Sequence, residues 1–185
     1  MVRWTAPADG QYSISAKFRS IAEKATTDVH VLHGGKPIFD SLINLEGHGM
    51  QAPFAADVSV KAGDKIDFAV GWGNGNYGAD STGIEISIKS ADGKTYDAAR
   101  EFSVDKNPSG VWSYGRLKAG VSPDASTFHP YDKGRVIGDP AETREVIGSL
   151  SNPGSMVWED VVIDGPSGKY RFLVTFQQGA AAAGG

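Results

Sequence analysis

The residues between positions 71 and 83, GWGNGNYGADSTG, combine side chains that a sugar-binding site uses. Aromatic rings offer flat apolar surfaces, and amides and carboxylates offer paired hydrogen bonds to hydroxyl groups. The five glycines permit a tight backbone path with positive φ angles. The candidate ligand contacts are Trp72, Asn74, Asn76, Tyr77 and Asp80. The same segment also suits a plain connection between strands, in which Trp72 ends a strand and Asp80 closes the loop through local hydrogen bonds.

A second aromatic group lies in NPSGVWSYG, residues 107–115. In an extended segment, alternation places Trp112 and Tyr114 on the same face. Such a pair forms either a flat platform for a polysaccharide or part of a core, and we include both residues among the candidate ligand contacts. Trp4 and Trp158 are expected to pack inside the protein.

No residue pattern indicates a catalytic site. His30 and His33 are three residues apart on an expected strand, so they point to opposite faces and cannot share a metal ion. A glycosidase needs two carboxylates across a cleft, but no spacing selects a pair from Glu46, Asp57, Glu85 and Glu101. The serine of NPSGVWSYG lacks the Gly-x-Ser-x-Gly context of a hydrolase. We therefore predict a protein that is not an enzyme, and keep a polysaccharide hydrolase as the least favoured alternative.

Composition excludes several other classes of site. The chain has 185 residues and no cysteine, which rules out disulfides, thiolate zinc sites and thiol catalysis. With 22 acidic and 18 basic residues and no basic stripe, it is not expected to bind nucleic acid. No apolar run reaches the roughly 20 residues that span a bilayer, so no membrane insertion is expected. A signal peptide is absent from this chain. Calcium remains compatible with its oxygen-rich loops, but no Asp-x-Asp-x-Asp spacing assigns the ligands.

The elements that must position these residues are short strands. GQYSISAKFRS alternates Tyr12, Ile14, Ala16 and Phe18 with polar residues, and TTDVHVLHGG, FAADVSVKAGD, KIDFAVGWG and GIEISIKSADGK follow the same pattern. Together with 24 glycines, they predict an all-β sandwich or jelly roll. One short helix at most is expected, in DPAETREVIGSL at residues 139–150, where Asp139 can cap and Pro140 can occupy the first turn.

Two segments at opposite ends of the chain are similar. GQYSISAKF at residues 10–18 aligns with GKYRFLVTF at residues 168–176, and each follows a tryptophan. The similarity fits either two copies of one framework strand or two unrelated amphipathic strands that each follow a turn.

VRWTAPADGQYSI, TTDVHVLHGGKPIFD, VSVKAGDKIDFAVGWGNGNYGADSTGIEISI and NPSGVWSYG resemble jelly-roll modules of large secreted and surface proteins of environmental bacteria. These modules are similar to carbohydrate-binding or galactose-binding-like domains. The resemblance covers roughly two thirds of the chain. It implies a lectin-like, extracellular or cell-surface protein whose partner is a polysaccharide or another glycan, with calcium common in such modules. It also favours the core interpretation of Trp112 and Tyr114.

The order of these segments departs from that of the modules they resemble, in which the NPSGVWSYG type comes first. We therefore divide the chain into a portion at residues 1–95, a second portion at residues 96–179 and a tail at residues 180–185. The second portion either completes the same sandwich by circular permutation or belongs to a second, partial module. In the latter case, unpaired strand edges predict a homo-oligomer, and the chain would be a structural or adhesive unit.

Overall fold

A computed structural model gives the fold. It describes residues 1–21, 25–71, 80–103, 106–117, 123–130, 134–136, 145–147, 156–165 and 168–177, with only the backbone described from residue 134 onwards. Strands dominate this part of the chain, and a single 3-10 turn, η1 (Ala125–Thr127), is its helical element. Among the described residues, no helix has the length and apolar character needed to cross a membrane.

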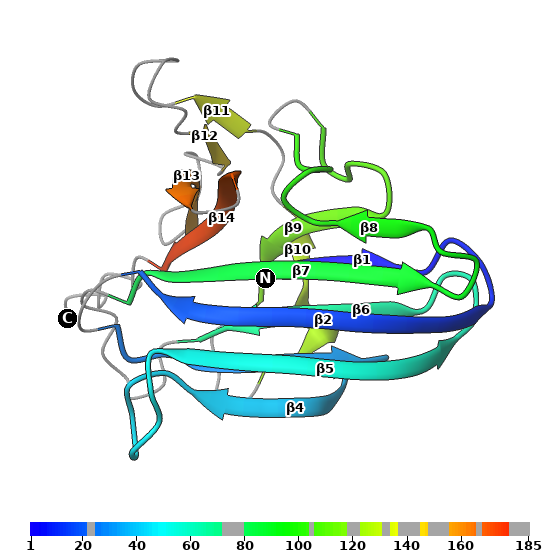
Figure 1. The fold of residues 1–185 in the computed structure, drawn as a ribbon, viewed down its shortest axis with the longest axis horizontal. Coiled ribbons are helices and arrows are strands. Elements are labelled where there is room, and N and C mark those ends of the chain that lie inside the picture. The colour runs from blue at the N-terminus through cyan, green and yellow to red at the C-terminus, as the bar shows by residue number, and fades with distance from the viewer. Residues whose placement is uncertain are drawn as a thin grey trace, which may run out of the picture.

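The strands form two antiparallel sheets that face each other, so the protein is an all-β sandwich as predicted (Figure 1). In order, sheet A contains β10 (His129–Pro130), β9 (Trp112–Arg116), β1 (Val2–Thr5), β6 (Lys65–Val70), β3 (Asp28–His33) and β4 (Lys36–Leu42). Sheet B contains β11 (Gly134–Val136), β12 (Glu145–Ile147), β13 (Met156–Gly165), β14 (Gly168–Gln177), β7 (Thr82–Ser90), β2 (Gly10–Ser20) and β5 (Gln51–Val60). The short strand β8 (Thr95–Asp97) also pairs with β7.

The core between the sheets follows from the alternation in the sequence. On β2, Tyr12, Ile14, Ala16 and Phe18 are buried, whereas the serine residues between them are exposed. The largest buried rings are Trp4, Phe18, Phe68, Trp112 and Tyr114, each 0% exposed. At about 25 cal/mol per Å² and 150–250 Å² per ring, each contributes roughly 4–6 kcal/mol of transfer free energy. This core fixes which side chains remain available at the surface.

A smaller cluster covers the outer face of sheet A. Met1, Leu32 and Ala69 are buried there with Leu117 and Phe128 packed against them. Beside this cluster, the Arg3 guanidinium binds both oxygens of Asp67, at 2.7 and 3.1 Å, and donates to the carbonyl of Ala125 at 2.8 Å. It also lies 4.2 Å from the centre of the Phe128 ring. The segment around η1 is thereby tied to the outside of sheet A.

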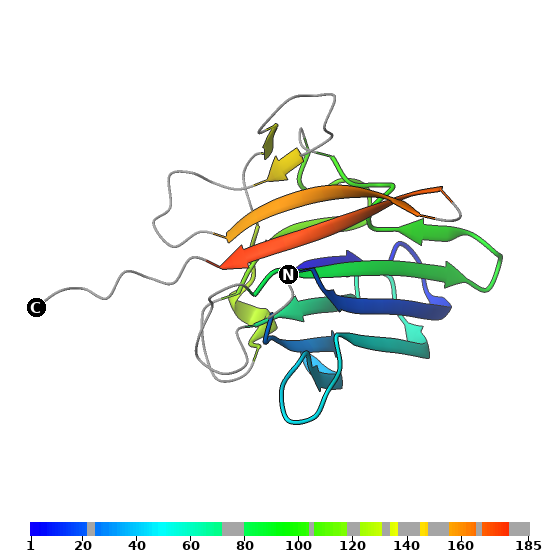
Figure 2. The same ribbon diagram turned by 60° about the vertical axis from the view of Figure 1, so that its left-hand side comes forward.

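Strands from both predicted portions of the chain enter the same two sheets. In sheet A, β9 pairs with β1, and Trp112 lies opposite Trp4. In sheet B, β14 pairs with β7 over Thr82–Ile84, while β8 pairs with the same strand over Ser87–Lys89. The two similar segments of the sequence are β2 and β14, which lie on either side of β7. Figure 2 shows β14 in red beside the green strand β7.

At one side of the sandwich, the two sheets end in β4 and β5. Within the described residues, each of these strands pairs on one side only. Phe39 of β4 lies 5.1 Å from Phe54 of β5 and stacks on Phe18 at 6.4 Å, which closes the gap between the sheets. Each edge strand also contains a proline, Pro37 in β4 and Pro53 in β5. Because proline lacks an N–H donor, it is typical of edges that do not recruit a further strand.

The helix expected at residues 139–150 is wrong where the structure describes the segment. Glu145–Ile147 forms strand β12, which pairs antiparallel with β11 and β13. Val146 and Ile147 are β-branched, and β-branched residues favour strands over helices. The capping pattern at Asp139 and Pro140 lies outside the described residues.

Candidate functional site

Three connections meet at one end of the sandwich, which we call the loop end. Its described residues are Ile21, 25–27, 43–50, Gly71 and 80–81. The N–H of Ile21 donates to the carbonyl of Ser81 at 2.9 Å, and the N–H of Ile43 donates to that of Thr27 at 2.8 Å. The connections are therefore held together by backbone hydrogen bonds between segments distant in sequence. Such tied loops on a rigid sandwich are a common place for binding residues.

Asp80 lies at the centre of these contacts. Its Oδ1 accepts hydrogen bonds from the Thr26 backbone N–H at 2.7 Å and the Thr26 hydroxyl at 3.2 Å. Its Oδ2 is buried and has no hydrogen-bond partner within the part of the chain that the structure describes. Burial raises the pKa of Asp80, the Thr26 hydrogen bonds lower it, and the charge of Asp28 raises it, with a net upward shift. A donor that reached this carboxylate would stabilise its charged form.

Asp28 and His30 occupy the outer face of sheet A beside the loop end. His30 Nε2 lies 2.6 Å from Asp28 Oδ2, and His30 Nδ1 lies 2.5 Å from Asp40 Oδ1 on β4. The N–H of Gly71 donates to the Asp28 carbonyl at 2.9 Å. A Cβ at Gly71 would lie only 2.2 Å from Asp28 Oδ1, so a larger residue here would displace the Asp28 carboxylate from its present position. The start of the 71–81 connection is thereby fixed to the Asp28–His30 pair.

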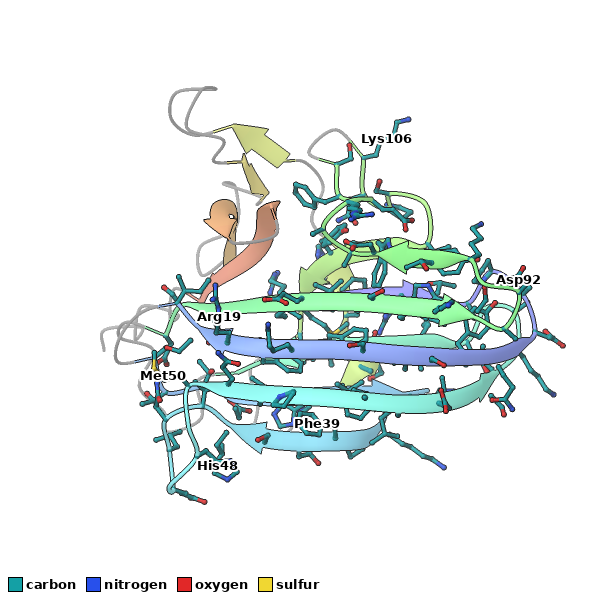
Figure 3. The ribbon with its side chains drawn as sticks, viewed as in Figure 1. Arg19, Phe39, His48, Met50, Asp92 and Lys106 are labelled. Atoms are coloured by element: carbon teal, nitrogen blue, oxygen red, sulfur yellow. The ribbon has the colours of Figure 1, made fainter. Side chains whose placement is uncertain are left out.

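The connection at residues 43–50 brings further polar groups to the loop end. Asn44 and Glu46 have φ angles of 52° and 50°, in the left-handed region that disfavours most side chains. The Asn44 side chain donates to the carbonyl of Ala25 at 2.8 Å, which joins this connection to the segment before β3. His48 and Met50 are exposed, and Figure 3 shows both at this connection. The loop end thus presents amide, imidazole and carboxylate groups within a few residues.

Of the predicted ligand contacts in the 71–83 segment, the structure describes Asp80 and places it at the loop end. Trp72, Asn74, Asn76 and Tyr77 lie outside the described residues. Their role stays a prediction.

The other predicted pair is placed in the core. Trp112 and Tyr114 are both 0% exposed, which excludes a flat platform at the surface and agrees with the packing alternative. Tyr114 lies with its ring 5.1 Å from that of Phe102, and its hydroxyl donates to the carbonyl of Ala98 at 2.9 Å. A ring with no exposed surface cannot stack on a sugar. Trp4 is buried in the same core, and the side chain of Trp158 lies outside the described residues.

The rest of NPSGVWSYG also serves the fold. Asn107 accepts from the N–H of Tyr114 at 2.9 Å and donates to its carbonyl at 2.7 Å, as a neighbouring strand would. Ser109 and Trp112 exchange backbone hydrogen bonds across a two-residue turn, in which Gly110 has a φ of 58°. At Gly115, a Cβ would lie 2.3 Å from the carbonyl oxygen of His129. This motif is accounted for by strand β9 and its turn.

The carboxylates considered for hydrolysis are engaged on separate elements. Asp57 accepts from Ser13 on the outer face of sheet B, and Glu85 pairs with Lys17 at 3.0 Å on the same face. Glu101 accepts from the backbone of Asp97, and Glu46 belongs to the 43–50 connection. His30 and His33 have different neighbours: His33 lies 3.9 Å from Asp64. Over the described ranges, no group of three or more histidine, aspartate or glutamate residues could hold a metal ion.

Sequence reasoning missed the contacts made by His30. Asp28 and His30 are two residues apart, and on a strand that spacing indicates a shared face. The His30–Asp28 contact could therefore be predicted from the sequence. Asp40 lies opposite His30 through the β3–β4 register. That register shifts between Val31 and Leu32 at a β-bulge, and a bulge cannot be placed from one sequence with certainty.

No protein-family model matches the chain, and no curated protein matches it. The likeness to bacterial jelly-roll modules therefore rests on the sequence segments alone.

Proposed function

We propose that the protein is a non-catalytic carbohydrate-binding module that recognises a glycan through the loop end. The main support is the convergence of three connections around Asp80, where the 71–81 connection meets Thr26 and the Asp28–Gly71 contact. The proposal places Trp72 and Tyr77 as stacking residues and Asn74, Asn76 and Asp80 as hydrogen-bonding residues.

Physical chemistry favours this end over other surfaces. Sugar recognition combines apolar contact on a ring with convergent hydrogen bonds, and the 71–81 connection contains both kinds of group in a short span. The carboxylate of Asp80 is already oriented by Thr26, so a bound hydroxyl would meet an acceptor whose position is fixed. Outside this end, Trp4, Trp112 and Tyr114 are completely buried and offer no stacking surface.

The first experiment is a glycan-array screen with purified protein, run once with calcium and once with a chelator. Retained glycans are then tested by calorimetry with Trp72→Ala, Tyr77→Ala and Asp80→Asn. Loss of one stacking ring is expected to weaken binding by roughly 5- to 150-fold, taking the roughly 1–3 kcal/mol by which an aromatic side chain stabilises a stacked base as the scale for a sugar ring. The calcium arm tests whether binding needs the ion, which remains an open prediction.

Lys94→Ala serves as the matched control. Lys94 is exposed in the turn that follows β7. This turn lies at the opposite end of β7 from the loop end, and the Lys94 Nζ lies 4.8 Å from the ring centre of Tyr96. Its removal should leave both folding and glycan binding unchanged. Unaltered affinity in all three loop variants, each shown to be folded by circular dichroism, would contradict the assignment.

The alternative is a structural or adhesive unit that assembles through strand edges. The prolines in β4 and β5 weaken it for that side of the sandwich, because each of these two edge strands lacks an N–H donor at one position. Light scattering over a concentration series separates the two proposals, since edge assembly requires a mass that rises with concentration. The third alternative, a polysaccharide hydrolase, gains no support from the separated carboxylates at Asp57, Glu85 and Glu101.

A further inference from the structure

We propose that His30 is a proton-operated clamp: when its imidazole is protonated it adds a side-chain tie between β3 and the edge strand β4 to their backbone pairing, and when it is neutral this tie is lost and β4 is held less firmly. The proposal starts from the two contacts of the ring. Nε2 lies 2.6 Å from Asp28 Oδ2, and Nδ1 lies 2.5 Å from Asp40 Oδ1. Both are hydrogen-bond distances to carboxylate oxygens.

Two such contacts demand two protons. A neutral imidazole has one N–H and one lone pair, whereas an imidazolium has two N–H donors. Ionised carboxylates can only accept, so a neutral ring satisfies one of Asp28 and Asp40 and presents a lone pair to the other. The proton belongs to the ring, because the reference pKa of histidine is about 6.5 and that of aspartate about 3.9.

Exposure decides which contact breaks first. The side chain of Asp40 is 59% exposed and can be hydrated at little cost, while that of Asp28 is 24% exposed. The Asp28 carboxylate also lies close to Gly71, whose N–H donates to the Asp28 backbone carbonyl at 2.9 Å. The remaining proton therefore stays on Nε2 towards Asp28, and the contact that ties His30 to Asp40 on β4 is lost.

The charged groups around the imidazole ring also favour its protonated form. Burial lowers the pKa of His30, but the hydrogen bonds and charges of Asp28 and Asp40 outweigh it, and the net shift is upward. On β6, the residue opposite His30 is Ala69, which has no charge. Asp67, also on β6, is paired with Arg3, and Asp80 adds its charge near Asp28. No described basic side chain on β3, β4 or β6 contacts the ring to oppose protonation.

Loss of the His30–Asp40 contact affects packing because Phe39 precedes Asp40 on β4. The Phe39 ring stacks on Phe18 and lies against Phe54, which closes the side of the sandwich between β4 and β5. Figure 3 labels Phe39 at this side. With a pKa raised above 6.5, the contribution of His30 to stability is complete below about pH 6.5. It is lost as the pH rises through the folded-state pKa. The clamp thus makes this side of the sandwich looser as the pH rises through the raised pKa of His30.

Local measurements are needed, because another buried group acts in the opposite sense. Burial lowers the pKa of the Met1 amino group to about 4, although the charge of Asp67 raises it. This amine favours folding increasingly as the pH rises from about 4 to 8. Overall stability therefore mixes the two effects, whereas amide exchange on β4 reports the clamp.

The test is hydrogen exchange of the β4 amides, residues 36–42, between pH 5.5 and 8.5, expressed as protection corrected for intrinsic rates. Protection is expected to fall about tenfold with rising pH, the loss expected from one charge-assisted hydrogen bond. In His30→Gln, protection should be low and independent of pH. His33→Gln is the matched control: His33 is on the same strand but 3.9 Å from Asp64, so the pH response should persist.

Nitrogen NMR of the His30 ring provides a second test that needs no variant. Two protonated ring nitrogens are expected at pH 6, and a single proton, on Nε2, above the transition. A ring with one proton at pH 6 overturns the proposal, as does β4 protection that is independent of pH in the parent protein. The proposal is also overturned if β4 protection in a folded His30→Gln variant depends on pH as it does in the parent protein.

Discussion

At the scale of single residues, packing at glycine positions determines what the sandwich tolerates. A Cβ at Gly115 would lie 2.3 Å from the backbone oxygen of His129 and 2.5 Å from the Phe128 ring. Since the backbone cannot yield cheaply, Gly115→Ala is expected to lower the free energy of unfolding by about 3 kcal/mol. Chemical denaturation followed by tryptophan fluorescence measures this loss.

Gly49→Ala is the control for this substitution. A Cβ at Gly49 would have no heavy atom within 4 Å, and its change should stay within about 0.5 kcal/mol of the parent. Equal stability of the two variants would mean that the contact between β9 and the segment at Phe128 is not formed as described.

At the scale of elements, β9 depends on the Asn107 side chain, which makes the backbone hydrogen bonds that a neighbouring strand would otherwise make. Asn107 both donates to and accepts from the backbone of Tyr114. Asn107→Ala would leave a partly buried N–H and carbonyl without these partners, and is expected to cost about 2–3 kcal/mol. Lys106→Ala, at the exposed neighbour that Figure 3 shows pointing outward, should change stability by less than about 0.5 kcal/mol. Urea denaturation of both variants tests the difference, and similar losses would contradict the role of Asn107.

The elements were also where sequence reasoning was most successful. Alternation of apolar and polar residues predicted β2 and the sandwich, because one buried face per strand imposes a period of two. The capping pattern at Asp139 and Pro140 misjudged residues 145–147, because it precedes β-branched residues that pair with β13. Local signals there conflicted, and pairing with a distant strand decided the outcome.

The candidate site was less accessible to sequence reasoning. Asp80 could be selected from its loop composition, but its Thr26 partner lies 54 positions away and no local pattern indicates it. The burial of Trp112 was undecided from the residues alone, since an aromatic residue on a strand suits a core and a surface platform equally. Which alternative holds depends on whether another sheet covers that face of β9, and here the face belongs to the core that also contains residues of sheet B.

At the scale of the whole molecule, the division at residues 95 and 96 can be tested by truncation. Among the residues whose side chains the structure describes, which end at residue 130, every member of the core cluster lies between Val2 and Tyr114, and β9 supplies Trp112 and Tyr114. A fragment of residues 1–105 loses both rings, at about 3–5 kcal/mol each, which is comparable to the 5–15 kcal/mol that stabilises a typical domain. We expect this fragment to be unfolded and a fragment of residues 1–130 to fold.

Far-ultraviolet circular dichroism and thermal melting of the two fragments distinguish the two organisations of the chain. A folded fragment 1–130 beside an unfolded 1–105 means that β9 completes the first sandwich in a permuted order. A cooperative transition in fragment 1–105 would contradict this, and would mean that the residues after 105 are not needed to complete the first sandwich. If both fragments are unfolded, β14 is needed as well, because it covers the edge of β7 at Thr82–Ile84 and its loss would leave that edge unpaired.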